Sequence, residues 1–318
     1  MNRRAVLKAS VVATTPVLAG CSSSNSTGQD TEKAQEHIRE AGKALESAGE
    51  EITSESAKFE ESEFQDGGVD IETATIDGYL ETATSELDEA GEYANEDQQE
   101  LIDTARGYIS FASKAVEFLD TFAEGYSQAF TGFTYFQSER FEDAVDELET
   151  AESSLAESDD LLTVTQSRAG DLNTDRLTDL ESVEIQSIEP TLEDMDELIT
   201  VFRSMIGGMI SLSDGMIDFT EADSHLEDER YGDAEEAFQS ASDDFSAAQS
   251  TFRSEEETAP TEVKSTFIEM TCYSGSLKDA SAHFANSMEA IQNGDQSQAE
   301  SEVNAAEEDL NRCDFSTS

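Results

Sequence analysis

The 318-residue sequence is poor in proline, the residue that most strongly interrupts regular helices. It contains only Pro16, Pro190 and Pro260, and it has no run of alternating β-branched residues that would predict strands. Apolar residues instead recur three and four positions apart over long stretches, which is the period of an amphipathic helix. The sequence therefore predicts an all-α fold of long antiparallel helical hairpins, arranged as a bundle or as a superhelix.

Basic residues are also scarce, with 18 Lys and Arg against 73 Asp and Glu, so the formal net charge is −55. Three of the cations, Arg3, Arg4 and Lys8, lie in the first 20 residues, and without them the charge becomes −58. Binding to phosphate requires clustered cations, so this composition excludes nucleic acid as a partner.

The acids are not gathered in blocks but are interleaved with apolar residues at helical spacing. This distribution favours a folded domain with a solvated acidic coat over a disordered chain. At multimolar salt the Debye length falls to about 3 Å or less, which screens the repulsion within such a coat. The composition resembles that of proteins from extreme halophiles of the haloarchaeal type. In such proteins the abundance of acids is an adaptation to the salty solvent.

The first 20 residues carry an export pattern. Arg3 and Arg4 precede an apolar run over residues 9–19 that is too short to cross a bilayer core of about 30 Å as a helix. The run ends in Leu18-Ala19-Gly20-Cys21. Residues 1–20 thus resemble a twin-arginine signal peptide with a lipobox. This resemblance implies that a lipid on Cys21 anchors the protein at the extracellular face of the cell membrane.

The residues after the export pattern divide into a tether and one domain. Residues 21–31 are Ser-rich and predict a flexible tether, in which Asn25 begins a glycosylation sequon. Residues 32–318 predict an acidic all-helical domain, with a possible loop at residues 166–189, where the apolar pattern is least regular. Pro190 then predicts a helix start.

Two glycines interrupt the helix that is predicted to follow Pro190. Gly207 and Gly208 lie near its middle, where each would cost about 1 kcal/mol relative to Ala. Such a pair predicts either a kink or a close approach of another helix. The methionines of the same stretch predict core packing rather than a ligand groove.

Three segments of the domain are related in sequence. The hexapeptide from Glu139 to Ala144 recurs 90 positions later from Glu229 to Ala234, and a weaker copy begins at Gly294-Asp295. The segments resemble the turn and second helix of tetratricopeptide hairpins, with Ala144, Leu148 and Ala151 at the diagnostic places. The offsets of 90 and 65 depart from the family spacing of ~34 residues, and the closing proline is missing. The resemblance therefore implies hairpins with lengthened first helices.

Cys272 and Cys313 are the two cysteines that remain after Cys21. They lie about 21 residues before and about 19 residues after a predicted turn near Asn293-Gly294, which places each roughly 30 Å from that turn in an antiparallel hairpin. The extracellular space is oxidising. The sequence therefore predicts a Cys272–Cys313 disulfide.

Motifs of catalysis are missing from the sequence: it has no nucleophile elbow, phosphate loop, CxxC pair or HExxH. His37, His225 and His283 each have a carboxylate within one helical turn, but acids are so frequent that such pairs are expected by chance. We expect no catalytic residue, no metal and no cofactor. We expect instead a lipoprotein that binds or scaffolds another protein through its hairpins. The alternatives are a solute- or metal-binding lipoprotein serving transport, and a spacer without a ligand.

Overall fold

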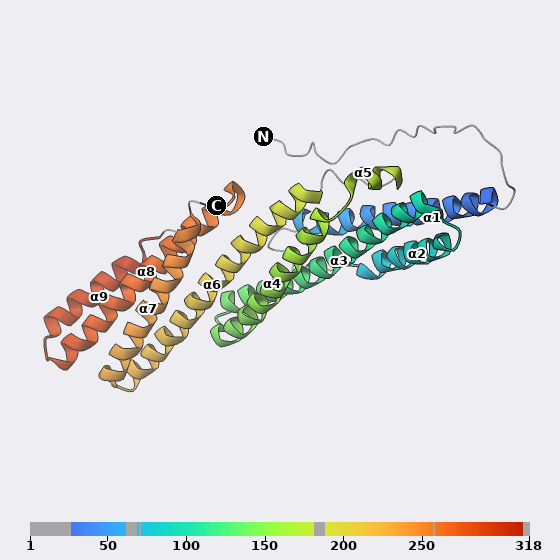
Figure 1. Cartoon of the computed structure of the whole chain (residues 1–318). Helices are drawn as coiled ribbons and strands as arrows, with labels where there is room; N and C mark the ends of the chain where they lie inside the picture. The colour runs from blue at the N-terminus through green and yellow to red at the C-terminus, as the bar shows by residue number, and fades with distance from the viewer. Residues whose placement is uncertain (1–26, 62–68, 70, 181–187, 257, 314–318) are drawn as a thin grey trace.

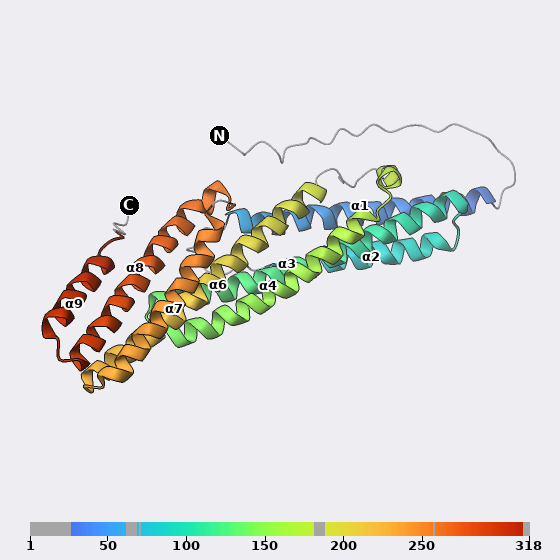
Figure 2. The same ribbon diagram turned by 60° about the vertical axis from the view of Figure 1, so that its left-hand side comes forward.

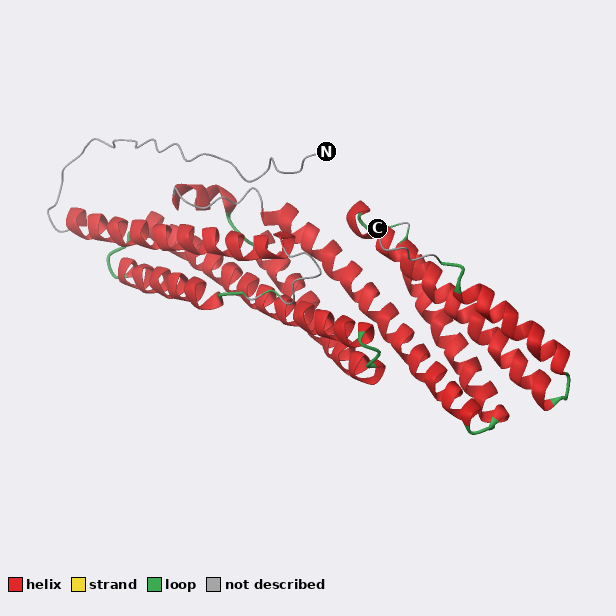
Figure 3. Cartoon of the chain, turned by 180° about the vertical axis from the view of Figure 1, so that it is seen from behind, coloured by secondary structure: helices red, strands yellow, loops and turns green. Residues whose placement is uncertain are grey.

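The computed structural model of the protein describes residues 27–61, 69, 71–180, 188–256 and 258–313. The predicted signal peptide with Arg3 and Arg4, the lipidation site Cys21 and the sequon residue Asn25 lie outside these residues. Within the described ranges the chain forms helices and no strand (Figure 3), so the predicted all-α fold is confirmed.

The helices, in chain order, have the following bounds: α1 Thr27–Glu61, α2 Thr73–Gly91, α3 Glu96–Gln137, α4 Phe141–Gly170, α5 Thr174–Leu177, the 3₁₀ turn η1 Thr178–Leu180, α6 Ile188–Glu227, α7 Tyr231–Glu255, α8 Thr261–Gln292 and α9 Gln296–Leu310. Helices α1, α2 and α3 pack on one another at one end of the molecule (Figure 1). From α4 onward, α6, α7, α8 and α9 follow in a row, and Figure 2 shows this row from another side. Each helix of the row packs mainly against the helices before and after it.

An aromatic cluster joins α1 and α3 to α6. Phe122 of α3 is fully buried, and its ring lies edge-on to Phe59 of α1 at 5.0 Å and to Phe202 of α6 at 6.1 Å between ring centroids. Phe118 stacks on the same ring at 6.0 Å. Edge and offset contacts of this kind stabilise beyond the apolar area that they bury. They place α3 between α1 and α6 in the core.

The three related segments form the same turn. Glu139, Glu229 and Gly294 have φ values of 59°, 58° and 77°, which place all three in the left-handed region. The N–H of Arg140 donates to the carbonyl of Tyr135 at 3.0 Å, and that of Glu139 to Phe136 at 3.0 Å. The other two turns repeat both hydrogen bonds at the same spacing. Each turn is a Schellman motif that closes one helix and opens the next, so the three related segments have the same local structure.

The repeat also determines how closely the paired helices approach. The second helices bury Leu148, Leu155 and Leu162 in α4 and, 90 positions later, Phe238, Phe245 and Phe252 in α7. Glycines of the first helices face several of these side chains. A Cβ on Gly215 would lie 2.5 Å from the ring of Phe245, and one on Gly208 would lie 2.3 Å from that of Phe252. Of the two roles predicted for the Gly207-Gly208 pair, Gly208 therefore serves a close helix contact.

Two predicted boundaries are wrong where the structure describes them. Of the possible loop at residues 166–189, residues 166–170 continue α4, and α5 and η1 cover residues 174–180. The apolar pattern did not predict a helix in this segment, because some of its contacts are polar. Arg168, for example, hydrogen bonds to Ser110 of α3. Residues 27–31 of the predicted tether belong to α1, where the carbonyl of Thr31 accepts a hydrogen bond from Gln98 of α3 at 3.0 Å.

Candidate functional site

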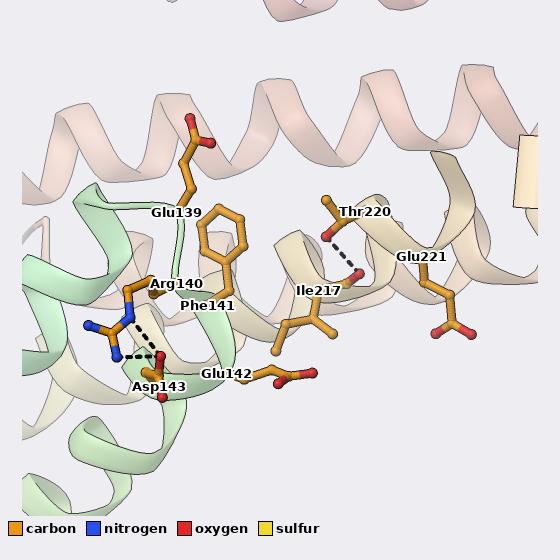
Figure 4. A pocket seen from close by; sticks show the side chains of 8 residues that line it. All are labelled: Glu139, Arg140, Phe141, Glu142, Asp143, Ile217, Thr220 and Glu221. Carbon is orange, nitrogen blue, oxygen red and sulfur yellow. Dashed lines mark hydrogen bonds and ion pairs between the residues drawn. The ribbon is translucent and has the colours of Figure 1, made fainter. Parts of the chain in front are cut away.

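An open cleft lies where the α3/α4 turn diverges from the end of α6 (Figure 4). It encloses about 540 Å³. We call it the α4/α6 cleft. Its lining consists of eight residues from the turn and from α6: Glu139, Arg140, Phe141, Glu142, Asp143, Ile217, Thr220 and Glu221. Two adjacent hairpins thus contribute to one surface.

The repeated turn fixes the α4 side of the cleft. Left-handed backbone at Glu139 directs the chain into α4, so Arg140 and Phe141 stand at the mouth of the cleft. Arg140 Nε donates to Asp143 Oδ2 at 2.7 Å, and its guanidinium lies 4.0 Å from the ring centroid of Tyr135. The hydrogen bond to Asp143 raises the pKa of Arg140. This cation is therefore already engaged within its own turn.

The apolar part of the cleft comes from Phe141 and Ile217. Phe141 is half-buried, and its ring lies edge-on to that of Phe136 at 5.4 Å, which holds its orientation. Ile217 is half-buried on the facing helix, and the nearby Thr220 hydroxyl donates back to its carbonyl at 3.0 Å. Figure 4 shows both apolar side chains between the two ribbons. The cleft thus offers an apolar floor.

Carboxylates surround that floor. Glu139, Glu142 and Glu221 are exposed, and Asp143 holds the only cation of the lining, Arg140. An apolar floor with an acidic rim complements a segment that carries an apolar side chain and a cation.

Acidic side chains continue from the cleft into the interface of α6 and α7. Burial and the nearby Asp218 and Asp214 raise the pKa of Asp244 to about 6. Burial, Asp218 and Glu149 of α4 raise the pKa of Asp214 as well. Three helices thus present carboxylates to one region, where like charges disfavour ionisation.

The predicted histidine–carboxylate pairs are only partly present. His37 contacts not Glu40 but Glu86 of α2, at 2.7 Å from Nδ1. His225 Nε2 lies 3.4 Å from Glu221, as its spacing suggests. His283 contacts two α9 residues, Glu302 at 2.7 Å and Asp309 at 3.5 Å, whereas Asp279, four residues earlier on its own helix, pairs with Arg312 at 2.8 Å.

Two of these histidines therefore connect neighbouring helices. His37 joins α1 to α2, and its hydrogen bond to Glu86 raises its pKa. Among the described residues, no three His, Cys, Asp or Glu side chains are grouped so that they could hold a metal ion. None of the described helices combines the length and the apolar character needed to cross a bilayer.

The predicted disulfide is present in the structure. Cys272 of α8 and Cys313, which follows α9, are joined with their Cα atoms 6.1 Å apart. The bond closes a loop of sequence separation 41 around the α8/α9 turn. The level positions inferred from counting residues on the two helices are therefore correct.

The cleft itself could not be predicted from the sequence. The aromatic at position 141 and the repeated turn were visible as a pattern, but Ile217, Thr220 and Glu221 enter the cleft only because α6 diverges from α4. That divergence depends on the packing of α6 against both α4 and α7, which are far apart in the sequence. No model of a known protein family matches the chain, and no curated protein and no solved structure matches it either.

Proposed function

We propose that this protein is a non-enzymatic lipoprotein, anchored outside the cell membrane by a lipid on Cys21, that binds or scaffolds another protein through its helical hairpins. The export pattern and the Leu18-Ala19-Gly20-Cys21 sequence support the anchor. The observation that carries the binding function is the α4/α6 cleft, with its apolar floor and acidic rim between two hairpins.

The chemistry of the cleft defines the partner segment. Phe141 and Ile217 offer apolar contact, and central apolar contacts contribute most of the free energy of binding at protein interfaces. Glu139, Glu142 and Glu221 favour a partner that presents Lys or Arg beside its apolar residue. At multimolar salt the charges contribute less, so the apolar contact dominates affinity there.

The test compares two matched variants in quantitative purification from membranes at native salt. Ile217→Glu places a charge in the cleft, whereas Ile268→Glu places the same charge at a side chain that is 50% exposed on α8. We expect Ile217→Glu to lose a partner that both the wild-type chain and Ile268→Glu retain. Circular dichroism establishes that both variants remain helical.

The same preparations distinguish the alternative function. Identical protein sets with all three chains would contradict binding in the cleft. A stoichiometric metal or small solute in the wild-type protein would instead favour a solute- or metal-binding lipoprotein serving transport.

A further inference from the structure

A second groove, of about 730 Å³, lies on the last hairpin and is lined by α8, the α8/α9 turn and α9. We call it the α8/α9 groove. Its apolar members include Ile291, which is 37% exposed, and the half-buried Val303. Its lining consists of eight residues: Ser287, Ile291, Gly294, Gln296, Ala299, Glu300, Val303 and Asn304.

Every lining residue has a counterpart 65 positions earlier, in the α6/α7 hairpin. The counterparts surround the turn at Glu229, as the lining residues surround the turn at Gly294. In the order of the lining, they are Ala222, Leu226, Glu229, Tyr231, Ala234, Glu235, Phe238 and Gln239. The α8/α9 groove is therefore the repeat-equivalent of a surface that the chain presents once before.

In the α6/α7 hairpin that surface is covered by a helix, α8. The ring of Phe284 lies 5.2 Å from Phe238 and 5.9 Å from Phe219, between centroids. Ala285 and Met288 of α8 are buried in the same apolar cluster as Phe238. At this surface, the α6/α7 hairpin therefore packs against the apolar face of the helix that follows it, α8.

Polar contacts fix the register of that covering helix. Eight residues after Phe284, the side-chain amide of Gln292 donates to Glu235 Oε2 at 2.7 Å. Glu235 corresponds to Glu300 of the α8/α9 groove, and Phe238 corresponds to Val303. Val303 is smaller than Phe238, so the groove has more room for an incoming ring.

We infer that the α8/α9 groove binds an amphipathic helix of a partner protein. An aromatic ring of the partner helix packs on Val303, and a hydrogen-bond donor eight residues further along the partner helix reaches Glu300. This inference rests on the proposed scaffold function, but it concerns a different surface from the α4/α6 cleft. A helix that lies in a groove through such periodic contacts is a common mode of peptide recognition.

Charge favours a partner over a second copy of this chain. Helix α9 contains five acids and no cation, and the whole chain has a net charge of −55. A second copy would therefore bring like charge to the groove. A helix with Lys, Arg or an amide at the donor position complements Glu300.

The experiment uses the full chain, purified at native salt, and a fluorescent synthetic peptide of α8 residues 277–292 as the probe. This peptide carries the ring of Phe284 and the amide of Gln292 at the required spacing. We expect saturable binding by fluorescence anisotropy, and binding about tenfold weaker or more for the Val303→Glu chain. The matched control is Val164→Glu, because Val164 is 39% exposed on α4, and it should bind like the wild type.

The outcomes separate the occupants. A peptide that fails to bind, or that binds the Val303→Glu and wild-type chains equally, overturns the inference. A dimer in sedimentation that Val303→Glu dissociates also overturns it, because a second copy then fills the groove. Ile291 lines the same groove from α8, so Ile291→Glu must weaken peptide binding as Val303→Glu does. Neither failure affects the Ile217→Glu comparison, which tests the α4/α6 cleft.

Discussion

Gly208 of α6 lies so close to Phe252 of α7 that a Cβ added to the glycine would stand 2.3 Å from a ring carbon. Phe252 is fully buried, so its ring cannot turn out into solvent without breaking the packing around it. Its neighbour Gly207 has no atom within 4 Å of the corresponding position. Two adjacent glycines of one helix therefore have opposite structural roles.

Gly208→Ala is expected to lower the free energy of unfolding by about 1–3 kcal/mol, because it overpacks the α6/α7 contact. Gly207→Ala is expected to raise it by up to about 1 kcal/mol, since alanine is the better helix former. Thermal unfolding at native salt measures both. Equal effects of the two substitutions would show that the α6/α7 contact is looser than described.

A second substitution checks the origin of that destabilisation. Leu162 stands in α4 where Phe252 stands in α7, 90 positions later. Phe252→Leu should therefore recover part of the stability lost in Gly208→Ala, because the shorter side chain leaves room for the methyl group. An additive double mutant would place the cause elsewhere.

The left-handed glutamates offer a stabilising change. Glu139 has φ of 59°, a conformation that is costly for residues with a Cβ, whereas Gly294 serves the same turn without that cost. Glu139→Gly is expected to raise the free energy of unfolding by about 0.5–1 kcal/mol. Glu142→Gly, within the first turn of α4, should lower it and serves as the control. Chemical denaturation distinguishes the two directions.

The half-buried carboxylates between α6 and α7 give the free energy of unfolding a pH dependence. Burial and the neighbouring Asp218 and Asp214 raise the pKa of Asp244 to about 6, above its ordinary value of 3.8. The folded state therefore favours the protonated form, and the stability from this group is present at low pH and is lost as the pH rises through about 6.

Asp244→Asn should accordingly raise the melting temperature at pH 7.5 and leave it unchanged near pH 4. Because the side chain is partly exposed and salt screens it, we expect a gain of about 1 kcal/mol or less at pH 7.5. Melting curves at both pH values and at two salt concentrations measure this. A loss of stability at pH 7.5 would mean that the Asp244 carboxylate forms a favourable contact.

Reduction of the Cys272–Cys313 disulfide should loosen the end of the row. The bond closes a loop of sequence separation 41, which corresponds to about 4 kcal/mol in the chain-entropy model. Since each helix of the row packs mainly against its neighbours, the effect should remain in α8 and α9. Hydrogen exchange with and without reductant measures it, and faster exchange throughout α3 and α4 would contradict local coupling.

Much of the secondary structure was predictable from residues that are close in sequence. Three features of the sequence were sufficient to predict helices and related turns: apolar residues three and four positions apart, the scarcity of proline, and the recurrence of the Glu139 segment at Glu229. Helices and turns depend on residues close in sequence. The disulfide followed from counting residues along one hairpin.

Other features depend on contacts across the fold and were not predictable. His37 pairs with Glu86, which is 49 positions away, rather than with Glu40 on its own helix. Residues 166–170 lack a clear apolar stripe, yet they continue α4, and Arg168 hydrogen bonds to Ser110 on α3, 58 positions earlier. The α4/α6 cleft likewise exists only through the angle between two hairpins. Its acids are too common in this sequence to mark it.

Binding of a partner protein in the α4/α6 cleft is tested most directly by photo-crosslinking in intact cells at native salt. A photoreactive residue replaces Thr220 in the α4/α6 cleft or, as the control, the exposed Thr82 on α2. Both hydroxyls donate to the carbonyl four residues earlier, so each replacement removes a hydrogen bond of that kind from its helix. We predict a discrete protein adduct from position 220 and none from position 82. No adduct at either position, or the same adducts at both, would contradict the account.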